Sequence, residues 1–251
     1  MKRRIVPVVL AVLVAVSAFA QTTDFFELAK SGSPMDVEAA ILKGAQVNDQ
    51  NSSGMTPLMV AARANPNPAV IAAIIAGGGD LKAQSRNGMT PLMYAAQFNP
   101  NPAAITALTA AGGDLKAQSR NGMTALMYAA QSNSNPAVVT ALTAAGGDLK
   151  AQSSNGMTAL MYAARANANP AVITAITAAG GDPKAQDKSG MTPLMYAAQA
   201  NANPAVIAAL LTAGGDAKAK ASNGKTAFDF AQNNMKLKGT DAYQMLEQAS
   251  Q

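Results

Sequence analysis

Methionines and carboxylates are the side chains of this chain that could do chemistry, because the sequence contains no histidine and no cysteine. This composition excludes nucleophilic catalysis of the Ser-His-Asp and Cys-His types. It also removes the imidazole and thiolate ligands that usually hold zinc, iron and copper. No glycine-rich phosphate loop precedes a Lys-Ser/Thr pair. We therefore expect a protein that is not an enzyme, with no catalytic residue, no metal-ligating residue and no cofactor.

One aspartate recurs every 34 residues, and a lysine follows it two positions later. A residue that is repeated identically in every unit usually serves the unit itself, and aspartates commonly hydrogen-bond to turn backbone. We therefore expect the aspartates to support turns and not to form a catalytic pair, and we expect the lysines to form a solvated row beside them. The aspartates are Asp80, Asp114, Asp148, Asp182 and Asp216, and the lysines are Lys82, Lys116, Lys150, Lys184 and Lys218.

Two methionines recur in the segment GMTPLMYAA, which spans residues 88–96 and has close copies starting at positions 54, 122, 156 and 190. Thioethers are soft ligands for Cu(I), so a methionine array that binds metal or buffers oxidants is an alternative function. Real sites of this kind cluster several thioethers around one point, whereas each helix end here supplies only one methionine. We therefore favour structural or binding roles for these side chains.

The two methionines of each copy call for different interpretations. Met93 follows Leu92 on a helix that must pack on both sides, so the second methionine is expected in the core. Met89 directly precedes the predicted start of that helix. It either projects from a binding surface, where a flexible and polarisable side chain adapts to a partner, or packs sideways against the methionine of the next unit. The sequence leaves these two interpretations equally weighted.

The whole pattern is a tandem repeat. Met-Thr pairs begin at positions 55, 89, 123, 157 and 191, and Lys225-Thr226 continues the series. Segments 85–118 and 119–152 differ at five of 34 positions. So regular a period indicates stacked structural units and not a single globular core.

Each unit contains signals for two short helices. Thr90 can cap a helix that Pro91 begins, and this first helix is predicted over residues 92–97. Asn101-Pro102 repeats the signal for a second helix, which runs to about residue 111 and ends at Gly112-Gly113. Residues 114–122 form an extended, turn-rich connection with Asn-Gly at its turn. Helices this short are marginal alone, so their stability must come from stacking.

The first twenty residues resemble a secretory signal peptide. Three basic residues at positions 2–4 precede an apolar run over 5–16 and an Ala-x-Ala end at 18–20. The run is shorter than the ~20 apolar residues of a comfortable membrane span. We expect a mature chain from Gln21, exported to the bacterial periplasm or secreted, without stable membrane insertion. Removal of three of the 19 basic residues leaves 16 against 14 acidic ones, which opposes nucleic-acid binding.

The repeat unit resembles the ankyrin repeat. TPLMYAA at 90–96 stands where that family has TPLHxAA, and AAGGDLKAQ at 110–118 stands where it has a GADVNA-type segment. The period is 34 here, against about 33 in the family. Methionine replaces the family's histidine at Met59, Met93, Met127, Met161 and Met195, which we expect to replace a hydrogen bonder with apolar bulk. Serine replaces a frequent first aspartate at Ser85, Ser119 and Ser153.

The resemblance implies an all-α repeat solenoid of about seven units joined by β-hairpin-like loops. Its expected organisation is a degenerate N-terminal unit over 21–50, five repeats over 51–220 and a degenerate C-terminal unit over 221–251. We expect a monomer. The resemblance also implies that the chain binds a protein or peptide in a concave groove, lined by the loop tips and the ends of the first helices. Thirteen residues are predicted contacts: Arg63, Arg86, Asn87, Met89, Gln97, Phe98, Arg120, Asn121, Met123, Met157, Arg165, Lys188 and Met191.

Overall fold

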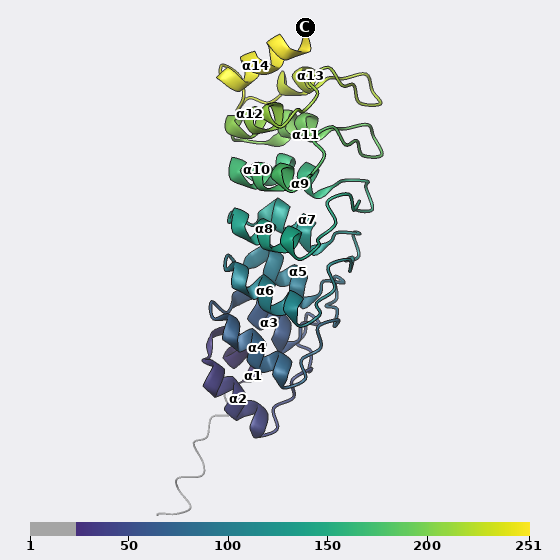
Figure 1. The fold of residues 1–251 in the computed structure, drawn as a ribbon. Helices are drawn as coiled ribbons and strands as arrows, with labels where there is room; N and C mark the ends of the chain where they lie inside the picture. Colours follow the sequence, from purple (N-terminus) through teal and green to yellow (C-terminus); the bar gives the residue numbers. More distant parts are fainter. Residues whose placement is uncertain (1–23) are drawn as a thin grey trace, which may run out of the picture.

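Within residues 24–251, fourteen short helices form seven pairs that stack into one elongated array (Figure 1). The computed structural model describes residues 24–251, so the predicted signal peptide and the expected mature end at Gln21 lie outside the described residues. Neighbouring first helices pack against one another along one side, and neighbouring second helices pack along the other. The predicted solenoid of paired helices is confirmed. The loops are turns, because residues 24–251 contain no strand.

The helices begin where the sequence predicts and differ only slightly at their ends. The first helices are α1 (Phe25–Ser31), α3 (Pro57–Ala64), α5 (Pro91–Phe98), α7 (Ala125–Ser132), α9 (Ala159–Ala166), α11 (Pro193–Ala200) and α13 (Ala227–Ala231). The second helices are α2 (Pro34–Leu42), α4 (Pro68–Ala76), α6 (Pro102–Ala110), α8 (Pro136–Ala144), α10 (Pro170–Ala178), α12 (Pro204–Thr212) and α14 (Asp241–Ser250).

The second methionine of each repeat caps its own helix. In α5 the amide N–H of Met93 donates to Thr90 Oγ1 at 3.4 Å, and the amide N–H of Thr90 donates to Met93 Sδ at 3.5 Å. Met93 is 1 % exposed, which confirms its expected place in the core. The expectation that methionine brings only apolar bulk is wrong, because its sulfur, although a weak acceptor, takes the N–H bond.

The same sulfur bond recurs at Met59, Met127, Met161 and Met195. All four side chains are fully buried. These five sulfurs are therefore already engaged at helix starts, where a Cu(I) array would need them open to the metal.

A row of buried asparagines, which the sequence analysis did not recognise, joins each repeat to the one before it. The Nδ2 of Asn99 donates to the carbonyls of Ala62 and Asn65, each at 3.1 Å, and its Oδ1 accepts the N–H of Asn101. Asn99 is 2 % exposed, so its amide meets the rule that buried polar groups are hydrogen-bonded. We call this row the asparagine seam; its members are Asn65, Asn99, Asn133, Asn167, Asn201 and Asn234.

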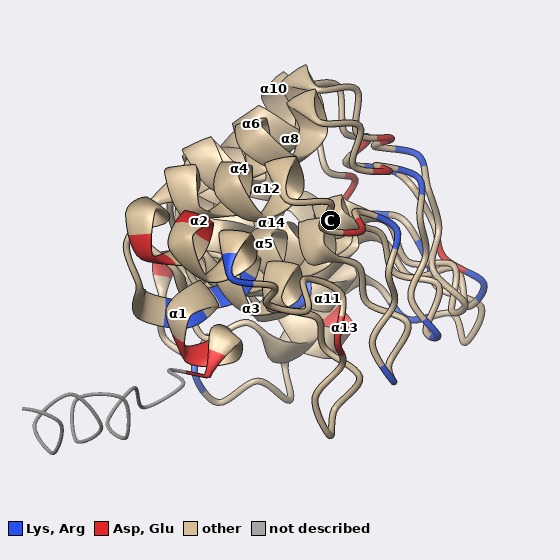
Figure 2. Ribbon diagram, turned by 90° about the horizontal axis from the view of Figure 1, so that it is seen from below, with Lys and Arg blue, Asp and Glu red and all other residues tan. Residues whose placement is uncertain are grey.

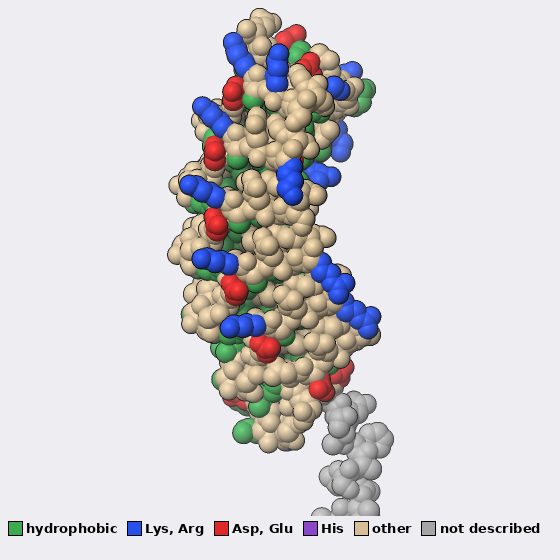
Figure 3. All heavy atoms as spheres, turned by 90° about the vertical axis from the view of Figure 1, so that its right-hand side faces the viewer, with side chains coloured by type: hydrophobic (Ala, Val, Ile, Leu, Met, Phe, Trp, Pro, Cys, Tyr) green, Lys and Arg blue, Asp and Glu red, His purple; other side chains and the backbone are tan. Residues whose placement is uncertain are grey.

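The recurring aspartates serve turns, as predicted. Asp114 Oδ1 accepts the backbone N–H of Lys116 at 2.8 Å, and the other four aspartates bond in the same way. Figure 3 shows a row of alternating acidic and basic side chains along the stack, with further basic side chains standing apart from it. Between α3 and α12, only α3 and α9 carry a charged residue, Arg63 and Arg165. Most charges of the internal repeats therefore lie on loops (Figure 2).

Candidate binding groove

The loop tips are fixed to one another by backbone hydrogen bonds. The N–H of Arg86 donates to the carbonyl of Ser53 at 3.2 Å, and that of Arg120 donates to Asn87 at 3.1 Å. Gly88 allows this approach, because a Cβ there would lie 2.9 Å from the nitrogen of Arg120 and the backbone φ is +73°. The tips therefore hold their side chains at a fixed spacing from repeat to repeat.

The ends of the first helices are fixed by the asparagine seam. Asn99 is the residue that caps the C-terminus of α5, and its side chain is bonded to the preceding repeat. Phe98 directly precedes it at the end of α5, and Arg63 lies in the last turn of α3. Rigid elements thus place these two side chains opposite the loop tips.

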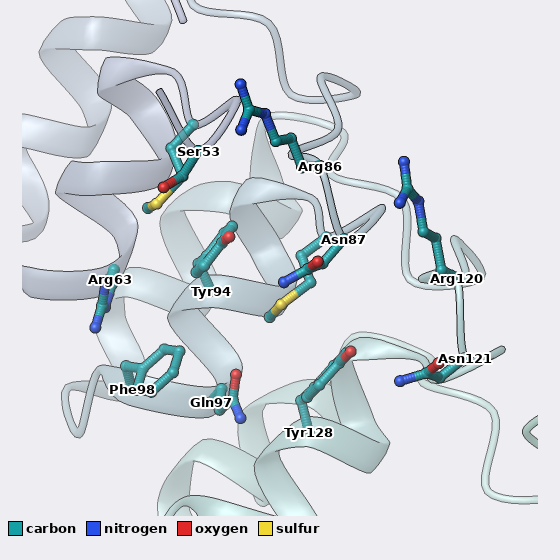
Figure 4. Close-up of a pocket in the computed structure, with 12 residues that line it drawn as sticks. Ser53, Arg63, Arg86, Asn87, Tyr94, Gln97, Phe98, Arg120, Asn121 and Tyr128 are labelled. Carbon is teal, nitrogen blue, oxygen red and sulfur yellow. The ribbon is translucent and has the colours of Figure 1, made fainter. Parts of the chain in front are cut away.

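An open groove of about 700 Å³ lies between the tips and these helix ends (Figure 4). It brings together eight of the thirteen predicted contact residues: Arg63, Arg86, Asn87, Met89, Gln97, Phe98, Arg120 and Asn121. Its other lining residues are Ser53, Met55, Tyr94 and Tyr128. No acidic side chain is among the twelve.

An aromatic and cationic cluster occupies one wall of this groove. The guanidinium carbon of Arg63 lies 4.7 Å from the centre of the Phe98 ring. That ring stacks on Tyr94, with centroids 6.4 Å apart and an interplanar angle of 22°. Phe98 is 45 % exposed, so the predicted exposed aromatic is present. Such a cation–π contact orients the guanidinium while its in-plane N–H groups stay available.

The first methionine of each repeat is buried. Met89 and Met123 are 6 % and 5 % exposed, and Met157 and Met191 are 2 % and 8 % exposed. Of the two interpretations weighed for this row, packing is therefore correct, and these four residues do not form an exposed contact surface. Met55 and Met89 still contribute to the floor of the groove. The reason is stacking, which covers a side chain that lies between successive loops.

The remaining predicted contacts lie outside this groove. Arg165 is exposed in the last turn of α9. The ammonium group of Lys188 forms an intramolecular hydrogen bond, because Nζ donates to the carbonyl of Ser154 at 2.7 Å. A second hollow of about 490 Å³, between Gln131 and Pro170, is lined by no charged residue. Arg165 and Lys188 therefore do not take part in the charged lining of the groove.

A row of tyrosines, not singled out in the sequence, contributes to the groove. Tyr128 and Tyr162 donate their hydroxyls to Ser119 and Ser153, each at 3.1 Å. The hydroxyl of Tyr196 donates to Asp187 Oδ2 at 2.6 Å. Burial, followed by this hydrogen bond and the carboxylate charge, raises the pKa of Tyr196 above its ordinary value.

Tyr94 differs from the other three tyrosines, since its hydroxyl has no hydrogen-bond partner within residues 24–251 and lines the groove. The corresponding serine, Ser85, accepts the N–H of Met89 at 3.3 Å, as Ser119 accepts that of Met123, but it does not take a tyrosine hydroxyl as well. The sequence signal was available, because a tyrosine follows Met93 and its counterparts in four units.

Comparison with known protein families shows to which family this chain belongs. A family model for three copies of ankyrin repeats matches residues 25–108 and 92–176, and a model for many copies matches residues 179–231. The chain belongs to the ankyrin repeat family. No curated protein gave a significant match. Ankyrin repeats are typically non-catalytic modules that bind other proteins.

Two further observations concern the described part of this ankyrin repeat chain. Residues 24–251 contain no cluster of three or more acidic, histidine or cysteine side chains that could hold a metal ion. No helix in that range has both the length and the apolar character needed to cross a bilayer.

Proposed function

We propose that this ankyrin repeat protein is exported to the bacterial periplasm or the secreted fraction, where it holds a partner protein or peptide in the groove described above. The observation that carries the proposal is the 700 Å³ groove itself, which is lined largely by residues that differ between repeats. Arginine and aromatic side chains, which lead among interface hot spots, occur together there.

The variable positions support this function because the scaffold does not require them. Phe98 is replaced by Ala64, Ser132, Ala166 and Ala200 in the other internal repeats. The scaffold tolerates these small residues, so an exposed phenylalanine at this one place is best explained by a contact outside the chain. An exposed aromatic of this kind would gain burial from a partner.

Replacement of Arg63, Arg86, Phe98 and Arg120 by serine tests the groove. The tagged full chain is expected to capture a partner from an envelope or culture-medium extract of its native cells, and this variant is expected to lose it. The matched control replaces Lys82, Lys116 and Lys150 by serine, which also removes three positive charges but leaves the groove intact. Capture that survives the groove substitutions, with the fold intact by circular dichroism, would contradict the proposal.

Sequencing the N-terminus of the native protein tests export. The signal-like segment predicts a mature chain that begins at Gln21. Purified native protein that still begins with Met1 would remove the envelope location from the proposal.

A further inference from the structure

The groove holds three cationic side chains and no acidic one, and Glu27, which lines an adjoining hollow together with Arg63, is paired with Lys30 at 3.5 Å. Arg63, Arg86 and Arg120 are exposed, and none of their guanidinium groups takes part in an ion pair or side-chain hydrogen bond within residues 24–251. By contrast, the lysines that follow the turn aspartates alternate with acidic side chains (Figure 3). Charge complementarity therefore favours an acidic occupant for the groove.

The spacing of two of these arginines restricts the shape of that occupant. Arg86 and Arg120 hold the same position in adjacent repeats, whose tips are bonded to one another. Packed helices lie ~8–10 Å apart, so equivalent side chains recur at about that interval. A polyproline II segment rises ~3.1 Å per residue with three residues per turn. Its residues i and i+3 therefore lie on one side, ~9 Å apart.

Other backbone conformations match this interval less well. In a β-strand, successive side chains alternate between faces, so residues i and i+3 point to opposite sides. An α-helix brings two side chains onto one face near this interval only with residues i and i+7, ~10.5 Å apart along the axis, so that two turns separate the carboxylates. A polyproline II segment is the conformation that presents a carboxylate to each arginine tip with every third residue.

The aromatic lining of the groove also suits such a segment. Tyr94, Phe98 and Tyr128 line it, and aromatic-lined grooves are the usual docking sites of proline-rich polyproline II segments. A polyproline II backbone has no internal hydrogen bonds, so its carbonyls need donors. The hydroxyl of Tyr94, which has no partner within residues 24–251, lies in this groove and can donate to one.

The C-terminal half of the stack lacks the free cationic side chain and the free tyrosine hydroxyl at the equivalent positions. The ammonium of Lys188 is bound to the carbonyl of Ser154, and the hydroxyl of Tyr196 is bound to Asp187. The carboxylate of Asp187, which also accepts the N–H groups of Ser189 and Met191, adds negative charge there. An acidic segment therefore belongs over α3, α5 and α7 and not over α9 and α11.

We propose, resting on the binding function proposed above, that the groove formed by Arg63, Arg86, Tyr94, Phe98 and Arg120 takes an acidic polyproline II segment of a partner protein. Its acidic side chains recur at every third residue, so that successive carboxylates meet Arg86 and Arg120. Prolines or other apolar residues between them cover the aromatic side chains that line the groove.

Fluorescence anisotropy with labelled peptides tests this inference on the full mature chain. The probe is a peptide of three Glu-Pro-Pro triplets, and the spacing control has the same composition with its three glutamates adjacent. A third peptide carries Lys-Pro-Pro triplets. We expect the first peptide to bind about tenfold more tightly than the other two, since each exposed ion pair contributes only modestly. Binding should also weaken as salt increases.

Two double variants locate the binding. R86S/R120S should lose about tenfold in affinity for the Glu-Pro-Pro peptide, whereas R165S/K188S, which removes the same charge from the C-terminal half, should keep it. Unchanged melting of both variants would show that the loss is not unfolding. Equal binding of the two glutamate peptides would overturn the spacing, and equal loss in the two variants would overturn the location.

Two further outcomes would count against the inference. Tighter binding of a single-stranded oligonucleotide, with the same dependence on Arg86 and Arg120, would make the occupant a nucleic acid. If the captured partner needs the groove but no Glu-Pro-Pro peptide binds or competes with it, this inference fails while the proposed function stands. If the partner ignores the groove substitutions altogether, the proposed function itself fails.

Discussion

Asn99 and Phe98 are neighbours in sequence, but Asn99 belongs to the asparagine seam between repeats and Phe98 to the groove. Asn99 is buried in the seam, and the same residue type fills its place in every other unit that contributes to the seam. Phe98 is exposed in the groove, and its counterparts are alanine or serine. The seam is held constant by contacts between repeats, whereas the groove varies because the stack does not depend on it. Variation within this chain therefore marks the surface that is free for a partner.

Substitution in the seam should have the largest effect on stability. Asn133→Ala leaves the carbonyls of Ala96 and Asn99, and one backbone N–H, without their partners in a buried position. We expect a loss of about 3 kcal/mol of unfolding free energy, because each buried unsatisfied group costs ~1–3 kcal/mol. Urea denaturation measures this loss. Asn135→Ala is the control two residues away; it removes an N-cap and a hydrogen bond to the Pro100 carbonyl, both exposed to water, and should cost only about 1 kcal/mol. Equal losses would remove the special role of the seam.

Substitutions in the tyrosine row should have a smaller effect on stability. The hydroxyl of Tyr196 is bonded within the scaffold, whereas that of Tyr94 lies in the groove. Tyr196→Phe removes the hydroxyl that donates to Asp187, and we expect a loss of about 1 kcal/mol, reduced from the usual value for a charged partner because the pair is partly exposed. Tyr94→Phe removes a hydroxyl without an internal partner, so it should leave the unfolding midpoint unchanged while weakening peptide binding. Comparable destabilisation by both changes would show that Tyr94 is scaffold as well.

The helix caps should respond to acid only in the end units. Hydrogen bonds from the backbone N–H and the hydroxyl of Thr226 lower the pKa of Asp229, which occupies the place of the capping methionines in α13. The side-chain and backbone hydrogen bonds of Ser33 likewise lower the pKa of Asp36 in α2. A lowered folded-state pKa means that the stabilisation is present above the unfolded value of ~3.9 and is lost as the pH falls through the folded value.

Hydrogen-exchange protection in α13 and α7, corrected for intrinsic rates, measures this difference between about pH 6 and pH 3. Protection in α13 should fall first, because methionine sulfur does not titrate and α7 keeps its cap. In Asp229→Asn, the acid-dependent part of the loss in α13 should disappear. Parallel loss in both helices of the unaltered protein would mean that acid acts on the whole stack instead.

The sequence by itself determined the repeat, the helix starts and the turns. Thr90 accepts a hydrogen bond from Met93, and Asp114 accepts one from Lys116. These bonds join residues two or three positions apart, so a short stretch of sequence is enough to predict them. The period places Arg86 and Arg120 in one row, and the resemblance to ankyrin repeats implied that this row and Phe98 line one groove. Their variation between repeats was enough to select that face.

Only the tertiary structure decided what each repeat does to its neighbour. The bond from Asn99 to Ala62 spans 37 residues, and no local pattern distinguishes this asparagine from a loop residue. The burial of Met89 depends on the stacking of successive loops. Such contacts form only when the repeats stack, because stacking brings together groups that are far apart along the chain.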